Sequence, residues 1–201
     1  MDNRSRLRLR QAGLPYAKSL EELDVSIYGG QITQLFINEP ASCQFIREHR
    51  NLIMIGSPGR GKTHIAIGIA LKACAAGMSV LYRNAAALCT QLREAREQQL
   101  LGRLEKRLRR ADLLILDELG YVRLDRYQSE LLFRVVADRS ERGSIIVTTA
   151  RPFAAWGELI DNEALATALI YRSITLDLSG PSYRLAQTRR ELGGAADPSP
   201  A

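Results

Sequence analysis

The chain has 201 residues, 46% of them hydrophobic, which suits one α/β domain with a proper core and short extensions. Its net charge of +6 favours a polyanionic partner, and no stretch reaches the roughly 18 apolar residues of a membrane span. Cys43, Cys74 and Cys89 are too widely spaced to indicate a disulfide framework or a zinc site, and the polar N-terminus lacks a signal-peptide core, so we expect a cytoplasmic protein.

Residues 1–30 are predicted to form a basic arm and linker, or a frayed helix end. Arginines alternate with leucines up to Leu9, and a Gly13-Leu14-Pro15 break follows. Residues 31–49 have an amphipathic pattern that predicts a helix broken near Pro40. We expect the main domain to span residues 31–192 and a disordered tail to span residues 193–201.

A phosphate-binding loop follows the first apolar run of the chain. It matches the pattern G-x-x-x-x-G-K-[ST] at every required position, with the residues Gly56, Ser57, Pro58, Gly59, Arg60, Gly61, Lys62 and Thr63. Residues 52–55 before it predict a buried strand, and residues 64–76 after it predict a buried helix. In such a loop, backbone N–H groups and a helix N-terminus point at one concavity that suits an anion.

Two side chains of this loop have expected roles, and a third has two possible positions. Lys62 is expected to place its ammonium on the β- and γ-phosphates, and Thr63 its hydroxyl on Mg²⁺. Arg60 either points to solvent or makes an extra phosphate contact, and we favour solvent. The alternative for the whole loop is a glycine-rich strand-to-helix turn without a ligand.

The chain then alternates between predicted strands and helices. A strand at residues 79–82 is followed by residues 85–110, which predict two helices or one long bent helix. Positive charge gathers there, because residues 93–110 carry seven basic side chains against three acidic ones. The basic residues are Arg93, Arg96, Arg103, Lys106, Arg107, Arg109 and Arg110.

An apolar run at residues 113–116 ends in Asp117 and Glu118, the pattern called Walker B. A buried parallel strand would deliver Asp117 beside the phosphate loop, where it can hold the water shell of Mg²⁺. Glu118 would then polarise the attacking water as a general base. An apolar run that ends in acids is often only a strand end, but its position one αβ unit after the phosphate loop favours the catalytic interpretation.

The remaining chain predicts three further helices and two strands. Asp125 and Gln128 have the spacing of a capping box that opens a helix, which Gly143 ends. Residues 144–149 predict a strand, residues 153–172 two short helices, and residues 174–178 a fifth strand.

From about residue 8 to residue 192, the chain resembles the IstB-like branch of the AAA+ ATPases, close to the DnaC-type helicase loaders. The matching motifs, in order, are the phosphate loop with His64-Ile65-Ala66, the acidic strand with Leu119-Gly120-Tyr121, the strand 144–146 leading to Arg151-Pro152-Phe153 and Trp156, and Gly180-Pro181-Ser182-Tyr183-Arg184. The first motif occurs in many ATPases, but the ordered run is specific.

The resemblance implies a five-stranded parallel sheet with helices on both faces, and binding of ATP with Mg²⁺. It implies assembly into rings or spirals on duplex DNA, as a helper of an insertion-sequence transposase. His64 and Arg184 would lie at the nucleotide, and Arg172 would reach into a neighbouring subunit's site; a surface arginine is the alternative for Arg172 and Arg184. The basic residues of the 93–110 segment would contact DNA phosphates with little sequence selectivity, unless this segment is an ordinary solvated helical face.

Three departures from the family pattern affect the implied function. Ala150 stands where the family usually has an asparagine that orients the attacking water, so either Thr148 or Thr149 substitutes or hydrolysis is slow. Tyr171-Arg172-Ser173 replaces the family's Asp-Arg-Leu, and the N-terminal helical domain is shortened. The alternatives are therefore a helicase loader and a non-hydrolysing clamp that binds ATP and DNA; a small-molecule phosphoryl transferase is disfavoured.

Overall fold

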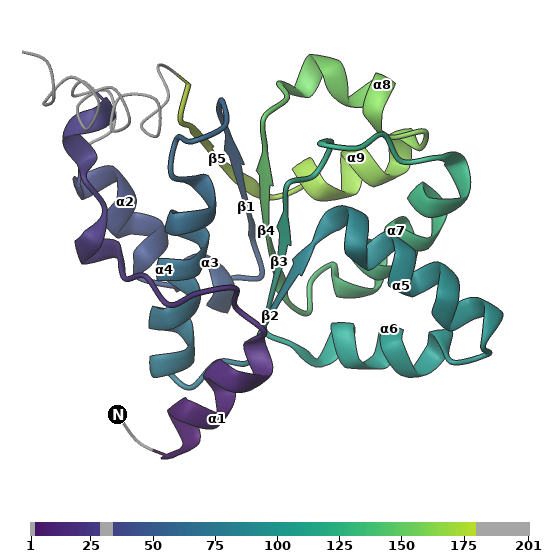
Figure 1. The fold of residues 1–201 in the computed structure, drawn as a ribbon, viewed down its shortest axis with the longest axis horizontal. Helices are drawn as coiled ribbons and strands as arrows, with labels where there is room; N and C mark the ends of the chain where they lie inside the picture. Colours follow the sequence, from purple (N-terminus) through teal and green to yellow (C-terminus); the bar gives the residue numbers. More distant parts are fainter. Residues whose placement is uncertain (1–2, 29–33, 180–201) are drawn as a thin grey trace, which may run out of the picture.

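The fold is a five-stranded sheet enclosed by helices, seen in a computed structural model that describes residues 3–28 and 34–179 (Figure 1). Arg184, the motif that contains it and the predicted tail at residues 193–201 lie outside the described residues. Within the described ranges, no helix is long and apolar enough to cross a membrane.

All five strands run parallel, in the order β2-β3-β4-β1-β5. They are β1 (Asn51–Ile55), β2 (Val80–Asn84), β3 (Leu113–Asp117), β4 (Ser144–Thr149) and β5 (Ser173–Asp177). Every residue of β3 and β4 is buried, as expected for central strands that are covered on both faces. The predicted fold class, a parallel α/β sheet with helices on both faces, is confirmed.

Helices from the two halves of the chain cover opposite faces of the sheet (Figure 1). One face carries α1 (Asn3–Ala12), α2 (Gln34–Ala41), α3 (Gln44–Arg47) and α4 (Lys62–Ala75), with 3-10 helices at Leu20–Glu22 and Val25–Tyr28. The other carries α5 (Ala85–Glu97), α6 (Leu101–Arg110), α7 (Arg126–Arg139), α8 (Trp156–Leu159) and α9 (Glu163–Ile170), with a 3-10 helix at Phe153–Ala155.

Alternating strand residues build two separate hydrophobic cores. Met54 of β1 and Ile115 of β3 pack in the core that includes α4, whereas Ile53 and Leu114 pack in the core that includes α5 and α7. This alternation follows from the two-residue period of a strand, in which successive side chains point to opposite faces. The continuous apolar runs of the sequence reflect burial on both faces.

The structure resolves the choices that the sequence left open. Residues 85–110 form two helices, separated by a turn in which Gln99 has a left-handed φ of 58°. Pro40 lies within α2, and that helix ends one residue later, so the predicted break is found there. The basic N-terminal segment forms the regular helix α1, which packs against α4 and β2 with Ala12 fully buried.

Arg139, the last residue of α7, is buried and forms hydrogen bonds to both the end of α6 and the start of β4. The Arg139 side chain is 1% exposed and donates hydrogen bonds to the carbonyl oxygens of Leu108, of Ser144 at 2.8 Å and of Asp112 at 3.4 Å. Burial lowers the pKa of this guanidinium to about 10. The last turn of α6 is therefore held against the sheet by a cation that donates to the Leu108 carbonyl group in that turn.

We predict that Arg139→Met lowers the free energy of unfolding by roughly 2–4 kcal/mol, because it keeps the stem but removes donors to buried carbonyl groups. Urea denaturation followed by circular dichroism measures the change. Arg142→Met, at an exposed position three residues away, is the control and should shift stability by less than about 0.5 kcal/mol. Equal effects of the two variants would contradict the role given to Arg139.

Candidate nucleotide-binding site

The phosphate loop lies at the carboxyl ends of the parallel strands, where open α/β sheets bind ligands. It follows β1 directly, and the Gly56 amide donates to the Thr149 carbonyl at the end of β4, at 3.2 Å. Its last residues begin α4 at Lys62. The predicted strand-loop-helix context of the motif is therefore present.

Close packing explains two of the loop glycines. A Cβ atom on Gly56 would lie 2.7 Å from the carbonyl oxygen of Leu178, just beyond β5. A Cβ on Gly61 would lie 2.8 Å from the Tyr28 hydroxyl, and Gly61 also has a left-handed φ of 76°. Tyr28, which precedes β1, and Leu178, which follows β5, therefore both pack against the loop.

Lys62 is held at the centre of the loop by backbone carbonyl groups. Its side chain is 9% exposed, and its ammonium donates to the carbonyl oxygens of Gly56 at 2.6 Å and Ser57 at 3.0 Å. Lys62 is also the first residue of α4, where the backbone N–H groups of the first turn have no intrahelical acceptor. Ammonium and helix N-terminus together favour a bound anion such as a phosphate.

Asp117 joins the loop to the sheet through three hydroxyl groups. Its carboxylate is 3% exposed and accepts from Thr63 at 3.0 and 3.2 Å, from Thr148 at 2.5 Å and from Tyr82 at 2.6 Å. Burial and the bond to Asp117 raise the pKa of Tyr82, which keeps this phenol a hydrogen-bond donor. The Thr63 hydroxyl and the Asp117 carboxylate are oxygen ligands of the kind Mg²⁺ takes beside substrate phosphates, so the residues fit this ion.

Glu118 is the exposed acid beside Asp117, and its orientation is set by an asparagine. The Asn84 amide donates to the Glu118 carboxylate at 2.9 Å, while the Asn84 amide oxygen accepts from Ala87 and caps α5. Glu118 itself has a left-handed φ of 60°, and its N–H donates to the Thr148 hydroxyl at 2.9 Å. Asn84 and Tyr82 were not among the predicted site residues; the available signal was that polar residues occur at the end of the strand that pairs with β3.

Arg60 does not point to solvent, so that prediction was wrong. Its side chain is 2% exposed and donates to the carbonyl oxygens of Leu178 at 2.9 Å and Ser179 at 3.2 Å. The guanidinium also lies 4.8 Å from the ring centre of Tyr28, whose hydroxyl donates to the Arg60 carbonyl oxygen at 2.8 Å. Burial raises the pKa of Tyr28 to about 12. Arg60 therefore connects the loop to segments on both sides of it.

A cavity of about 370 Å³ opens beside the loop, within the size range of small-molecule sites. The loop residues Pro58, Gly59, Arg60, Gly61, Lys62 and Thr63 line it together with His64, Glu118, Thr148, Thr149 and Ala150. The segment between α1 and α2 supplies another wall through Tyr16, Lys18, Glu22, Leu23 and Asp24, none of which was among the predicted site residues. The His64 ring nitrogen lies 2.6 Å from the Ser19 carbonyl oxygen and so fixes this wall.

The two threonines near Ala150 have different surroundings. The Thr148 hydroxyl already donates to Asp117 at 2.5 Å. Thr149 is 1% exposed, and its hydroxyl accepts from the Arg151 amide at 3.1 Å, which leaves its own proton for another acceptor. Of the two, Thr149 has the hydroxyl that is not bonded to Asp117.

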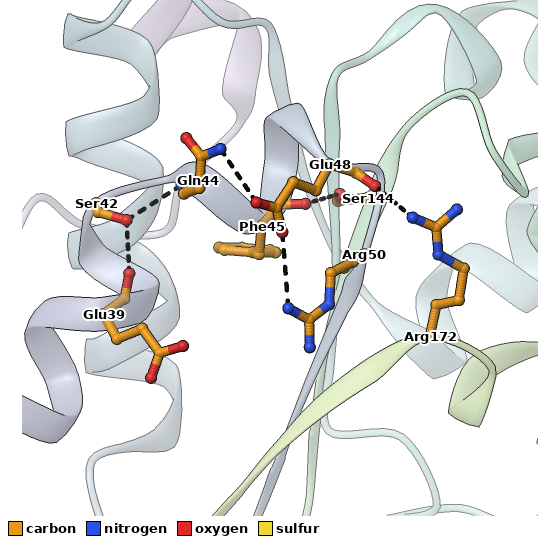
Figure 2. A network of polar contacts seen from close by, with 8 residues as sticks. All are labelled: Glu39, Ser42, Gln44, Phe45, Glu48, Arg50, Ser144 and Arg172. Atoms are coloured by element: carbon orange, nitrogen blue, oxygen red, sulfur yellow. Dashed lines mark hydrogen bonds and ion pairs between the residues drawn. The ribbon is translucent and has the colours of Figure 1, made fainter.

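Arg172 lies far from the phosphate loop of its own chain. It immediately precedes β5, whose first residue Ser173 pairs with Asn51 at the start of β1. The loop follows the other end of β1, five residues or about 16 Å along the strand. Figure 2 shows the Arg172 side chain beside the α3–β1 connection, where it donates to the Glu48 carbonyl oxygen at 3.1 Å. Arg172 is therefore not part of the cavity beside the phosphate loop of its own chain.

Two of the basic side chains at 93–110 contact other residues through an ion pair or an aromatic ring, and the other five form no ion pair with a described residue. Arg109 forms an ion pair with Asp138 at 3.1 Å, and the Arg96 guanidinium lies 5.3 Å from the Tyr127 ring centre. Glu105 pairs with Arg134 of α7 at 3.1 Å. The other five basic residues are exposed and form no ion pair with a described residue: Arg93, Arg103, Lys106, Arg107 and Arg110.

We predict that Lys62→Ala weakens ATP binding at least about tenfold, because the loop loses its charge-assisted hydrogen-bond donor to phosphate. Titration calorimetry with ATP and Mg²⁺ measures the affinity. Lys72→Ala is the control, since Lys72 lies on the same helix but pairs with Glu21 at the surface. Unchanged ATP affinity in Lys62→Ala would contradict the assigned site.

Comparison with known proteins identifies the family. The family model of the IstB-like ATP binding proteins matches residues 1–191. A putative ATP-binding protein of insertion sequence IS21 from Pseudomonas aeruginosa is 40% identical over 187 residues, which cover 91% of this chain and 70% of that protein. Its counterpart of IS5376 from Geobacillus stearothermophilus is 37% identical over 188 residues, covering 90% and 73%.

Solved structures share the fold at low sequence identity. The DnaC helicase loader superimposes with a TM-score of 0.63 at 22% identity and covers 83% of this chain and 96% of its own. AMPPCP-bound DnaA from Aquifex aeolicus superimposes with a TM-score of 0.72 at 18% identity, covering 90% and 56%. With the phosphate loop, Asp117 and the parallel sheet in place, the chain belongs to the IstB-like ATP-binding proteins and has the AAA+ phosphate-loop fold.

Proposed function

We propose that this protein is a Mg²⁺-dependent ATPase that assembles on duplex DNA with ATP and regulates a transposase. One observation supports the catalytic part: Thr63, whose hydroxyl donates to Asp117 at 3.0 Å, lines the same cavity as the exposed Glu118. A carboxylate at this position suits water as the phosphoryl acceptor, because it can take the proton of the attacking water.

The second part of the catalytic proposal concerns the position of that water. Ala150 lines the cavity but has only a methyl group, so it cannot orient water by a hydrogen bond. We assign this role to Thr149, a residue that lines the same cavity and whose hydroxyl accepts from the Arg151 amide and is not bonded to Asp117. A single neutral hydroxyl has one proton to donate, whereas an asparagine amide has two, so we expect slow turnover.

Arg172 supports a site shared between subunits. It is exposed and lies about one strand length from its own phosphate loop, too far to contact a nucleotide there. A guanidinium supplied by a neighbouring copy would stabilise the charge of the transferred phosphoryl group. Hydrolysis would then depend on assembly, and duplex DNA would promote it by bringing subunits together.

The names of the relatives favour transposition over replication for the biological role. The proteins that are 40% and 37% identical are named for insertion sequences IS21 and IS5376. The DnaC helicase loader, at 22% identity, shares the fold and remains the alternative, as a protein that delivers a helicase to DNA. A non-hydrolysing clamp is the other alternative, and Ala150 is the residue that favours it.

We predict that Glu118→Gln lowers the rate of phosphate release at least about 100-fold while ATP affinity stays within about threefold, because the amide cannot accept the proton of water. Steady-state phosphate release is measured with Mg²⁺ and ATP, with and without duplex DNA. Glu141→Gln, at an exposed position outside the cavity, is the control. A wild-type protein that binds ATP but releases no phosphate under either condition would support the non-hydrolysing clamp instead.

We also predict that Arg172→Ala and Glu118→Gln are each inactive alone but regain activity when mixed. In a mixed assembly, a subunit with an intact Glu118 can receive Arg172 from its neighbour. Random mixing of equal amounts makes such sites about one in four, so about a quarter of the wild-type rate should return. No recovery in mixtures that co-assemble, as shown by size-exclusion chromatography of differently tagged variants, would refute a shared site.

A further inference from the structure

A groove between α1 and α6 brings together the two most basic segments of the chain. It has a volume of about 250 Å³ and is lined by Arg8 and Gln11 of α1 and by Arg107 and Arg110 of α6. Its floor is formed by the start of β2 and by Ala111. Figure 1 shows the two helices on either side of the end of the sheet where β2 begins. Residues about 100 positions apart thus face one open space.

The three arginines of this groove are not neutralised by nearby acids. Among the described residues, no carboxylate forms an ion pair with Arg8, Arg107 or Arg110. The carboxylate of Asp112 lies beside the groove, where it accepts from the Ser79 amide at 2.7 Å and from the Ser79 hydroxyl at 2.8 Å, and it offsets part of the positive charge without pairing with one of these arginines. Positive charges that are not paired with counter-charges repel one another, and a bound anion would relieve that repulsion.

A fourth guanidinium strengthens the positive field at this position. Arg83 of β2 is half-buried, and its Nε atom is buried without a hydrogen-bond partner. Burial lowers the pKa of Arg83, and the charge of Arg107 lowers it further, so the two side chains lie close enough to repel. The local structure therefore holds like charges together, which is typical of a surface that receives a polyanion.

The helix α6 uses its two faces differently. Glu105 and Arg109 pair with Arg134 and Asp138 of α7, whereas Arg107 and Arg110 face the groove. Arg103, four residues before Arg107, extends the unpaired row along the helix, and Arg4 extends the row of Arg8 on α1 in the same way. Both walls are attached to the rest of the domain, one by the buried Ala12 and the other by the bond of Arg139 to Leu108.

We propose that α1 and α6 together form a two-walled groove that binds the phosphodiester backbone of DNA, so that the N-terminal helix is part of the DNA-binding surface. This inference rests on the DNA binding in the proposed function and assigns its location. Guanidinium groups bind phosphate oxygens with short charge-assisted hydrogen bonds, and contacts to the backbone select no sequence. Arginine side chains on opposing walls would grip one strand from two sides.

The test compares Arg8→Gln, Arg107→Gln and Arg47→Gln in the full-length protein with ATP and Mg²⁺. Arg47 is an exposed arginine on α3, outside the groove, and its substitution makes the same change in net charge. Fluorescence anisotropy with a 30-base-pair duplex measures affinity between 50 and 200 mM salt. We expect Arg8→Gln and Arg107→Gln each to weaken binding about three- to tenfold and to reduce the salt slope by about 1, equally on unrelated sequences.

Arg8→Lys keeps the charge and should bind within about threefold of the wild type, which separates lost phosphate contacts from a misfolded α1. A single-stranded oligonucleotide should show the same ranking of variants, because the groove is proposed to hold one backbone. If Arg107→Gln weakens binding but Arg8→Gln behaves like Arg47→Gln, the two-walled groove is wrong while DNA binding by the protein stands. If the wild type binds no duplex, the proposed function itself fails.

Discussion

The carboxylate of Asp117 is the point on which the nucleotide site depends. It lies at the end of a fully buried strand and accepts hydrogen bonds from Thr63, Tyr82 and Thr148, which come from α4, β2 and β4. A buried anion is costly unless donors surround it, and here the three hydroxyls satisfy it. The same bonds fix the first turn of the phosphate-loop helix relative to the sheet. Asp117 therefore contributes both to the geometry of the nucleotide site and to the stability of the fold.

Much of the fold and the loop could be predicted because their signals are local. The five apolar runs and the glycine-lysine-threonine pattern each fit within ten residues, and periodicity or spacing identifies them. The capping box of Asp125 and Gln128, also a local signal, is present as predicted.

Arg60, Asn84 and the α1–α6 groove could not be predicted from the sequence, because each depends on segments far apart in the chain. Arg60 bonds to a carbonyl 118 residues later, and Asn84 to a carboxylate 34 residues later. The spacing of apolar residues in the sequence does not show which strand end lies beside which loop. Arg109 likewise belongs to a segment that the sequence shows to be basic, but its ion pair with Asp138 on α7 is seen only in the structure.

The contacts of Arg60 also bear on when the site forms during folding. Its guanidinium stacks on Tyr28, at the N-terminal side of the loop, and bonds to Leu178 and Ser179 beyond the last strand. A ribosome that has made only the phosphate loop, or even the strand that ends in Asp117, has not yet supplied Leu178. Long-range contacts of this kind form late, after the closure entropy of the intervening chain has been overcome. We expect that a nascent chain acquires its completed loop only after Ser179 has been made, so ATP does not stabilise truncated chains that stop before β5.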